Sequence, residues 1–318
     1  MLNWLVIGIG DITTRRVIPA ILAEERSRLY GVVSRDQSKG RKVAERVWTN
    51  LDAGLADPAI DAVYVGTPVA LHAPQTIAAL AAAKHVLCEK PVAMNYAEAL
   101  RMVQAARASA KIFGVAYYRR MYPKVQRARQ LIEQGAIGRP VLAEANHHSE
   151  LPAQGAFRSW LLDPELAGGG PLFDVASHRI DLFNYLFGKP ARVTAQISNV
   201  VHQVPVEDNA TVLIEYENGV RGVVDVRWHS KVTRDQFRFV GTDGEINLDP
   251  LSGPELVYPG GRDLLPPHDN IHFPCIQNFV SAVLDGAPLI SSGESAIWTD
   301  WVTTNALESS RGSGASLA

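Results

Sequence analysis

Two glycines near the start of the chain have the spacing of a phosphate-binding turn. Gly8-Ile9-Gly10 ends an apolar run and precedes a stretch, residues 13–29, with apolar residues at helical spacing. In a dinucleotide fingerprint the first glycine permits a tight turn and the second lets the backbone approach a pyrophosphate. We expect the helix N-terminus at Asp11 and Ile12 to bind that anion through backbone amides. The third glycine position holds Thr13, and a turn that only packs is the alternative.

The residues after the second apolar run indicate which nucleotide would bind. There the sequence reads Val33-Ser34-Arg35-Asp36. An acidic residue at the strand end would bond a free ribose 2′-hydroxyl and repel a 2′-phosphate. Ser34 followed by Arg35 favours the reverse, since a guanidinium can bind the phosphate and stack on adenine. The segment therefore predicts NADP over NAD. Asp36 keeps NAD possible, and an ordinary surface arginine is the alternative.

A lysine follows the fourth apolar run, in the segment Val86-Leu87-Cys88-Glu89-Lys90-Pro91. Ligands of open parallel sheets bind at the carboxyl ends of the strands. Lys90, fixed by the proline after it, could serve there as a positioned cation or a proton donor. A surface lysine is the alternative.

The first 120 residues alternate short apolar runs with helical patterns. The runs at 5–9, 30–33, 62–65, 85–88 and 112–116 are each followed by a helix-favouring stretch. Asn95, with Glu98 three residues later, has the spacing of a capping box. This rhythm predicts an N-terminal Rossmann domain of α/β class, with a doubly wound parallel sheet.

The pattern changes from about residue 122. Strand-like stretches lie at 192–201, 210–216, 220–228, 237–240 and 245–248, with Asn218-Gly219 and Asp243-Gly244 at hairpin positions. Helical stretches lie at 123–134, at 275–284 and at 295–307, and another runs from Pro171 to about residue 187. We therefore predict residues 1–120 as a dinucleotide-binding domain. Residues 121–318 are predicted as a substrate-binding and oligomerisation α+β domain with a large, mostly antiparallel open sheet.

Composition narrows the class of protein and of partner. The 318 residues are 47% hydrophobic and 20% charged, with a formal net charge of −2, which is ordinary for a globular protein. We expect no nucleic-acid or membrane partner from this charge. The two cysteines form neither a disulfide framework nor a zinc site. No export leader or continuous membrane-length apolar run is found, so we expect a cytoplasmic protein.

Four motifs together resemble the Gfo/Idh/MocA oxidoreductases, by motif from residue 5 to about 188 and by pattern beyond. They are Gly8-x-Gly10, Gly66-Thr67-Pro68 with His72, Glu89-Lys90-Pro91, and Gly168-Gly169-Gly170-Pro171-Leu172-x-Asp174-Val175-x-x-His178. The resemblance implies hydride transfer between a nicotinamide and a secondary alcohol or ketone carbon of a sugar or polyol. It also implies that Thr67, Pro68, His72 and Glu89 lie beside the nucleotide. His72 could instead cap its helix.

The same resemblance implies Lys90, Asp174 and His178 as catalytic residues. His178 would exchange the hydroxyl proton, Lys90 would hold the substrate oxygen, and Asp174 would orient His178 or hold a neighbouring hydroxyl. The spacing agrees, because residues four apart at a helix start share one face. The positive end of that helix would lower the pKa of His178 and favour its neutral form.

Substrate contacts are expected from Tyr118, Arg119, Arg158 and Trp160. Family members often carry Trp-Arg-Leu-Asp-Pro, whereas this chain has Leu161 in place of the arginine, and Arg158 is a possible substitute. Ala176 also replaces a usual glycine. Both departures bear on cofactor orientation more than on the chemistry.

Alternative functions and assemblies complete the expectations. A glycosidase that uses bound NAD for oxidation, elimination and re-reduction is one alternative. A non-catalytic nucleotide-binding regulator is another, but retention of the three catalytic residues argues against it. His147-His148 has no third ligand at suitable spacing, so we predict no metal site. The resemblance also suggests a homodimer or homotetramer through the C-terminal sheet.

Overall fold

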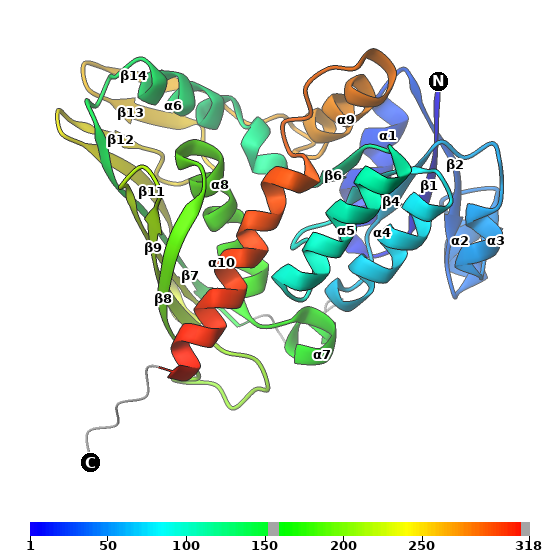
Figure 1. Cartoon of the computed structure of the whole chain (residues 1–318), viewed down its shortest axis with the longest axis horizontal. Helices are drawn as coiled ribbons and strands as arrows, with labels where there is room; N and C mark the ends of the chain where they lie inside the picture. The colour runs from blue at the N-terminus through cyan, green and yellow to red at the C-terminus, as the bar shows by residue number, and fades with distance from the viewer. Residues whose placement is uncertain (152–158, 313–318) are drawn as a thin grey trace. The chain divides into compact units, whose positions relative to one another are not determined.

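The computed structural model describes residues 1–151 and 159–312 (Figure 1). The chain divides into two compact units, and the first joins Met1–Tyr118 to His268–Ile297. The second joins Arg119–Pro267 to Trp298–Ala318. The division expected from the sequence, 1–120 and 121–318, therefore differs at residues 268–297.

The first unit contains a six-stranded, fully parallel sheet, and this confirms the Rossmann prediction. The strand order is β3-β2-β1-β4-β5-β6. Successive strands are added to one side of β1 up to β3 and then to its other side from β4 onwards, while all strands stay parallel. The strands are β1 (Leu2–Ile7), β2 (Ser27–Val33), β3 (Val47–Trp48), β4 (Ala62–Val65), β5 (His85–Cys88) and β6 (Phe113–Val115). Parallel strands covered on both faces need continuous apolar runs, and β4 is accordingly buried at all four positions.

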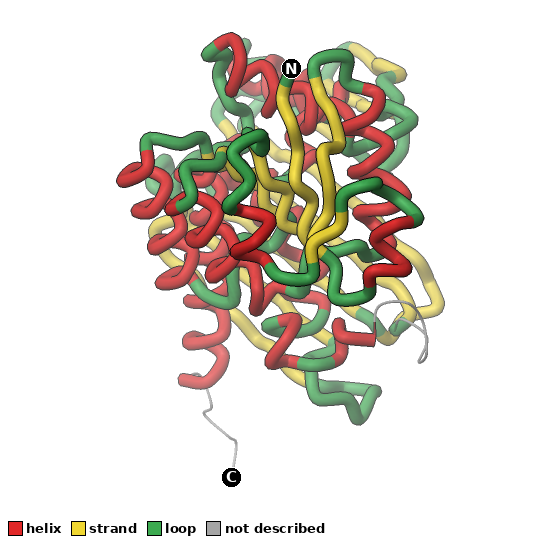
Figure 2. The backbone as a smooth tube through the Cα atoms, turned by 90° about the vertical axis from the view of Figure 1, so that its right-hand side faces the viewer, coloured by secondary structure: helices red, strands yellow, loops and turns green. Residues whose placement is uncertain are grey.

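Helices flank this sheet (Figure 2). They are η1 (Thr13–Val17), α1 (Ile18–Ala23), α2 (Gln37–Arg41), α3 (Leu51–Leu55), η2 (Val69–Leu71), α4 (His72–Ala81), α5 (Tyr96–Ser109) and α9 (Phe273–Asp285). The Asn95 side chain accepts from the amide of Glu98 at 3.0 Å and caps α5, as predicted. The helix predicted over 13–29 ends at Ala23, and that prediction was too long. Glu24 is extended, and its carboxylate accepts from the Arg26 amide at 2.8 Å, closing a turn before β2.

Packing explains why residues 268–297 belong to the first unit. The ring of Phe279 on α9 lies 5.2 Å from that of Trp4 on β1, centroid to centroid, and both side chains are fully buried. Further along, the amide of Val115 in β6 donates to the carbonyl of Ser291 at 3.0 Å. This late segment therefore completes the core and one edge of the Rossmann sheet.

The second unit contains an eight-stranded sheet of order β14-β13-β12-β11-β7-β10-β9-β8. Only the pair β7–β10 is parallel, so the mostly antiparallel prediction is confirmed. The strands are β7 (Pro140–Glu150), β8 (Pro190–Ser198), β9 (Asn209–Tyr216), β10 (Arg221–Arg227), β11 (His229–Gly241), β12 (Glu245–Asn247), β13 (Glu255–Tyr258) and β14 (Gly261–Leu264).

Helices of the second unit pack against one face of this sheet (Figure 1). They are α6 (Pro123–Glu133), α8 (Ser177–Phe187) and most of α10 (Gly293–Gly312). The short helix α7 (Pro164–Ala167) contacts η4 (Ser159–Leu162), and two further turns, η3 (Tyr118–Met121) and η5 (Leu172–Ala176), precede α6 and α8. Phe183 on α8 packs on Phe237 of β11 at 5.1 Å between ring centroids. On β9, Val212 and Ile214 are buried while Leu213 between them is 50% exposed, because alternate side chains of a strand point to opposite faces.

Across residues 1–151 and 159–312, none of the helices combines the length and apolar character required to cross a bilayer.

Candidate active site

The phosphate turn has the backbone geometry that a dinucleotide requires. Gly8 adopts a φ of +86°, and a Cβ there would lie 2.6 Å from the carbonyl oxygen of Gly66. Gly10 differs, because no heavy atom lies within 4 Å of the position a Cβ would take. The backbone at Gly10 is therefore open to an incoming group, as a pyrophosphate needs. Thr13 is buried, and its hydroxyl would lie 2.7 Å from a Cβ on Gly66, so it packs where the third glycine was expected.

The helix behind this turn begins irregularly. Its first full turn, η1, is π-helical, and the hydroxyl of Thr14 donates to the carbonyl of Gly10 at 2.9 Å. Asp11 pairs with Arg15 at 2.6 Å on the same helix face, while Ile12 is exposed. Asp11 and Ile12 thus lie at the helix N-terminus, as the phosphate-binding prediction requires of them.

Asp36, three residues after the end of β2, is the N-cap of α2. Its carboxylate accepts from the Ser38 hydroxyl at 2.7 Å and from the amides of Ser38 and Lys39, and so caps α2. These hydrogen bonds, that of the Ser38 side chain first, lower the pKa of Asp36. The Ser34 hydroxyl donates to the Asp36 carbonyl at 2.8 Å, and Arg35 is exposed. One oxygen of the Asp36 carboxylate therefore caps α2, and both Asp36 and Arg35 are exposed.

His72 joins two of the predicted motifs. It is 1% exposed, with Nε2 2.9 Å from the Thr67 carbonyl oxygen and Nδ1 2.8 Å from the Pro91 carbonyl oxygen. Burial lowers the pKa of His72, and the contacts with the Pro91 and Thr67 carbonyls oppose that shift. The Thr67 hydroxyl donates to Gln75 at 2.7 Å, and Pro68 precedes η2. His72 thus begins α4 and also links the turn at Thr67-Pro68 to the turn at Lys90-Pro91.

Lys90 follows β5 on a turn held by its neighbour Glu89. The Glu89 carboxylate accepts from the Tyr64 hydroxyl at 2.5 Å, from the Lys90 amide at 3.0 Å and from His272 Nε2 at 3.3 Å. Burial raises the pKa of Glu89, but the donors His272 and Tyr64 outweigh it and hold the pKa at about 2. Glu89 is therefore ionised at neutral pH. The Lys90–Pro91 peptide bond is cis.

In the second unit, a buried glutamate holds the glycine-rich turn before α8. The Glu207 carboxylate accepts from the amides of Gly170 and Leu172 at 2.8 and 2.9 Å. Burial raises the pKa of Glu207, against the effect of these hydrogen bonds. A Cβ at Gly170 would lie 2.1 Å from the Glu207 carbonyl oxygen, so only glycine fits there. No signal in the sequence indicated Glu207.

Asp174 and His178 lie on two different kinds of helical turn. The sequence predicted one regular helix from Pro171, whereas Asp174 lies in the π-helical turn η5 and His178 lies in the first turn of α8. The end at Phe187 was predicted correctly. His178 is 5% exposed, and Asp174 is partly buried. Single π-helical turns recur at functional sites, where they shift side chains relative to a regular helix.

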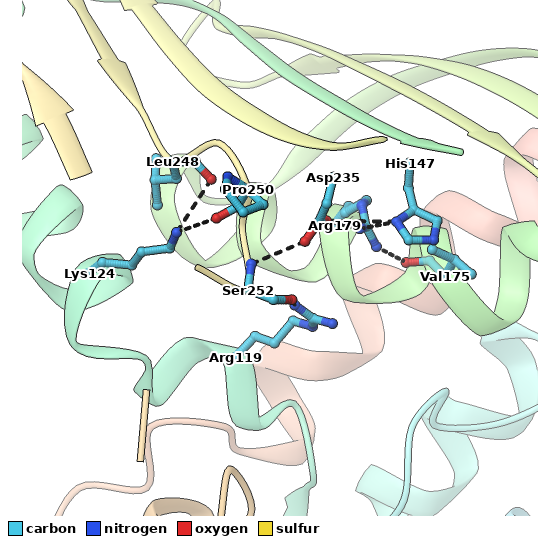
Figure 3. A network of polar contacts seen from close by, with 9 residues as sticks. All are labelled: Arg119, Lys124, His147, Val175, Arg179, Asp235, Leu248, Pro250 and Ser252. Atoms are coloured by element: carbon cyan, nitrogen blue, oxygen red, sulfur yellow. Dashed lines mark hydrogen bonds and ion pairs between the residues drawn. The ribbon is translucent and has the colours of Figure 1, made fainter. Parts of the chain in front are cut away.

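Arg179, next to His178, anchors this turn to the sheet (Figure 3). Its guanidinium donates to the Val175 carbonyl at 3.0 Å, to His147 Nδ1 at 2.8 Å and to the Asp235 carboxylate. Asp235 faces His147 across strands β11 and β7, and it also accepts from the Ser252 amide at 3.1 Å. Burial raises the pKa of Asp235, but His147 and Arg179 outweigh it and keep the pKa well below the usual value. This network was not predicted from the sequence.

The remaining predicted residues are placed as follows. Tyr118 is buried in the first unit, and Arg119 donates to the Ser252 hydroxyl at 3.0 Å in the second. Trp160 lies in η4, and Arg158 falls outside the described residues. Lys90 belongs to the first unit, whereas Asp174 and His178 belong to the second. His147 bonds Arg179 while His148 bonds Asp225 at 3.2 Å on the opposite sheet face, so the two rings do not converge on one ligand.

A separate cavity of about 440 Å³ lies at the amino end of β6, between the ends of α5 and α9. Its apolar lining residues include Ala106, Phe113 and Leu289, and the charged residues Arg107 and Glu294 also line it. None of the predicted site residues is among the residues that line it.

These features define an α/β protein with a dinucleotide-binding unit and a second, sheet-based unit, as found in nicotinamide-dependent oxidoreductases. The profile described as "Oxidoreductase family, NAD-binding Rossmann fold" matches residues 2–117, and the profile of the GFO/IDH/MocA C-terminal domain matches residues 125–247. The chain belongs to the Gfo/Idh/MocA family and is an NAD(P)-dependent dehydrogenase or reductase.

Named relatives cover most of the chain. It is 29% identical over 313 residues to a 1,5-anhydro-D-fructose reductase of Ensifer adhaerens, covering 94% of this chain and 93% of the relative. It is 29% identical over 264 residues to a D-xylose 1-dehydrogenase (NADP(+)) of Haloferax volcanii, and this match covers 80% of this chain and 79% of the relative. Among solved structures, an aldose-aldose oxidoreductase from Caulobacter crescentus, complexed with glycerol, superposes with a TM-score of 0.87 at 25% identity, covering 98% of each chain.

Proposed function

We propose that this chain transfers a hydride between NADP and a secondary alcohol or ketone carbon of a sugar or polyol. The bound nicotinamide supplies the hydride chemistry, and the protein supplies orientation and proton transfer. His178 takes the hydroxyl proton in oxidation and returns it in reduction. Lys90 holds the substrate oxygen and stabilises the negative charge that develops there. Asp174 orients His178 or holds a neighbouring hydroxyl.

The observation that carries this proposal is the way the lysine turn is held. Glu89 fixes the amide of Lys90 from one side, and His72 contacts the carbonyl of Pro91 on the other. His72 also contacts Thr67, in the turn that follows β4 next to Gly8. A lysine that served only solubility would need no such support. The same carboxyl edge of the sheet carries the open backbone at Gly10, which fits a pyrophosphate.

The preference for NADP rests on the two residues that follow β2. The Asp36 Oδ1 atom caps α2 through three hydrogen bonds, so a ribose 2′-hydroxyl would have to compete for it or use Oδ2 alone. Arg35 is exposed and able to bind a 2′-phosphate. The name of the xylose dehydrogenase relative, which includes NADP, agrees with this choice.

The proposal that the substrate is a sugar rests on the names of the relatives, whose stated substrates are 1,5-anhydro-D-fructose, D-xylose and aldoses.

We also propose that the chain forms a homodimer or homotetramer through the face of the eight-stranded sheet that bears Leu213. Exposed leucine on an open sheet face suits a subunit contact.

The first experiment is a fluorescence titration of the protein with NADPH and then NADH. We expect NADPH to bind at least about tenfold more tightly, which is roughly 1.4 kcal/mol. Arg35→Ala should remove most of this difference, whereas Arg41→Ala, at the last residue of α2, should not. Equal or tighter binding of NADH would show that Asp36 decides the cofactor. Binding of neither nucleotide by protein that carries none would contradict the proposed function.

The second experiment tests the substrate class. Turnover is measured with NADPH and 1,5-anhydro-D-fructose, and with NADP and D-xylose, D-glucose or inositol, from the change in NADPH absorbance. We expect at least one sugar or polyol to be oxidised or reduced with matching loss or gain of NADPH. Nucleotide binding without turnover of any of them would contradict the sugar and polyol assignment.

A further inference from the structure

His272 reaches the lysine turn from a distant part of the sequence. It immediately precedes α9 in the segment His268–Ile297, which packs into the first unit although 176 residues (92–267) lie between Pro91 and its start. Its side chain is 2% exposed, its Nε2 lies 3.3 Å from Glu89 Oε1, and its ring lies 4.4 Å from that of Tyr118.

The Glu89 carboxylate connects His272 to the backbone of Lys90, because it bonds both residues. Oε1 accepts from His272 and from the Tyr64 hydroxyl, while Oε2 accepts from the backbone amide of Lys90. A carboxylate is a rigid planar group, so two donors that fix Oε1 also fix where Oε2 meets the Lys90 amide. Charge-assisted hydrogen bonds of this kind are stronger than neutral ones.

The other ring nitrogen of His272 argues against a packing role alone. Within residues 1–151 and 159–312, Nδ1 of His272 is buried without a hydrogen-bond partner. A buried polar atom that is left unpaired costs about 1–3 kcal/mol, a cost that an apolar side chain in the same space would avoid. The bond to Glu89 is the contribution that an imidazole makes here and an apolar side chain would not.

We propose that His272 is a positioning residue for Lys90, which acts by holding Glu89 against the Lys90 amide. The inference rests on the proposed role of Lys90 in catalysis. The late segment thus contributes to the lysine turn as well as to the core. From the sequence this segment was expected in the second domain, and His272 was not among the predicted site residues.

Amide hydrogen exchange at Lys90, measured by NMR on the full chain, tests the contact without any substrate. His272→Phe keeps a ring beside Tyr118 and removes the donor, so the Lys90 amide should exchange at least about tenfold faster. His272→Gln restores an N–H donor and should bring the rate within about threefold of the wild type. Leu284→Ala, at an exposed position on α9 of the same segment, is the matched control and should leave the rate unchanged.

Two outcomes of this exchange measurement would overturn the proposal. One is a Lys90 exchange rate in His272→Phe within about twofold of the wild type. The other is a general acceleration that includes amides of β1, or loss of folding in both the Phe and Gln variants, because either indicates a packing role. Neither outcome depends on whether the protein turns over a sugar.

A double-mutant cycle then tests whether His272 acts through Lys90. With 1,5-anhydro-D-fructose and NADPH, His272→Phe should lower kcat about tenfold and leave the KM for NADPH within about twofold. In a Lys90→Ala background the same change should lower kcat no further, because the group it positions is absent. Losses that multiply in the double variant would contradict the proposal. Absence of turnover in the wild type would contradict the proposed function, and the exchange result would still decide the role of His272.

Discussion

At the scale of single residues, the site is built from side chains that hold backbone groups in place. His72 contacts the carbonyls of Thr67 and Pro91, and Glu89 accepts from the amide of Lys90. Glu207 does the same for the amides of Gly170 and Leu172 in the second unit. The residues proposed to perform chemistry are thus held indirectly, through the turns that carry them.

Removing a proposed catalytic side chain should affect turnover far more than nucleotide binding. We expect Lys90→Ala and His178→Ala each to lower kcat at least about 100-fold, because charge stabilisation or proton transfer is lost. NADPH affinity, measured by fluorescence titration, should stay within about threefold. His148→Ala, on the opposite sheet face from His147, is the control and should keep wild-type turnover. A fall in affinity as large as the fall in kcat would argue against these roles.

The low pKa of Glu89 makes its contribution to stability depend on pH. The folded-state pKa is about 2, below the ordinary value of 4.5. The unfolded chain therefore binds the proton more readily, and the stabilisation is present above about pH 4.5 and lost as pH falls towards 2. Glu89→Gln should remove it. The difference in free energy of unfolding between wild type and variant should shrink by about 3 kcal/mol across this range.

Urea unfolding of both proteins at pH 6 and pH 3 measures this difference, which should fall by about 2 kcal/mol between these two pH values because pH 3 still lies above the folded-state pKa. Glu165→Gln, an exposed carboxylate on α7, is the control and should show little change with pH relative to the wild type. A wild-type advantage over Glu89→Gln that is the same at both pH values would show that the carboxylate is not held as described.

At the scale of elements, patterns of residue type predicted the sheets better than the helical turns. β1, β4 and β5 were found because buried parallel strands need continuous apolar runs. The short strands β13 and β14 were missed, since they are only partly buried and lack that signal. The π-helical turns η1 and η5 were missed because one extra residue in a turn leaves the apolar periodicity nearly unchanged.

The glycine-rich turn before α8 should tolerate no side chain at Gly170. A Cβ there would lie 2.1 Å from the Glu207 carbonyl oxygen, so the two backbones must separate. We expect Gly170→Ala to lower the free energy of unfolding by roughly 1–3 kcal/mol, as for other overpacked positions, and to reduce turnover by displacing Asp174. Gly312→Ala, with no heavy atom within 4 Å of its Cβ position, is the control for both thermal and kinetic measurements. Equal stability of the two variants would contradict the contact.

At the scale of the whole molecule, the motifs were predictable but the membership of the first unit was not. Gly8, Lys90 and His178 could be singled out because their neighbours in sequence form recognisable motifs. The return of α9 to the first sheet depends on a pairing of distant residues, Trp4 with Phe279, for which one sequence provides no local signal. The same reason explains why His272, Glu207 and the network around Arg179 appeared only in the structure.

The proposed subunit contact belongs to this scale as well. Leu213 is 50% exposed on the sheet face opposite the one that packs on α8. If this face forms the contact, Leu213→Arg should convert a dimer or tetramer into a species of 34.6 kDa in light scattering, with NADPH affinity retained. Leu22→Arg is the control, since Leu22 is 63% exposed on α1 in the other unit. A wild type that is monomeric, or an assembly that survives Leu213→Arg, would contradict this contact.

The composition of the first unit from two separated segments has a consequence for biosynthesis. When residue 118 has left the ribosome, the six strands are present, but Trp4 still lacks Phe279 and β6 lacks its contact at Ser291. The missing segment ends 179 residues later (297 − 118), roughly 9–36 s at about 5–20 residues per second. During that interval the nascent sheet exposes apolar surface that a chaperone could bind. The unit that contains Gly8 and Lys90 is thus completed only after residue 297 has been made.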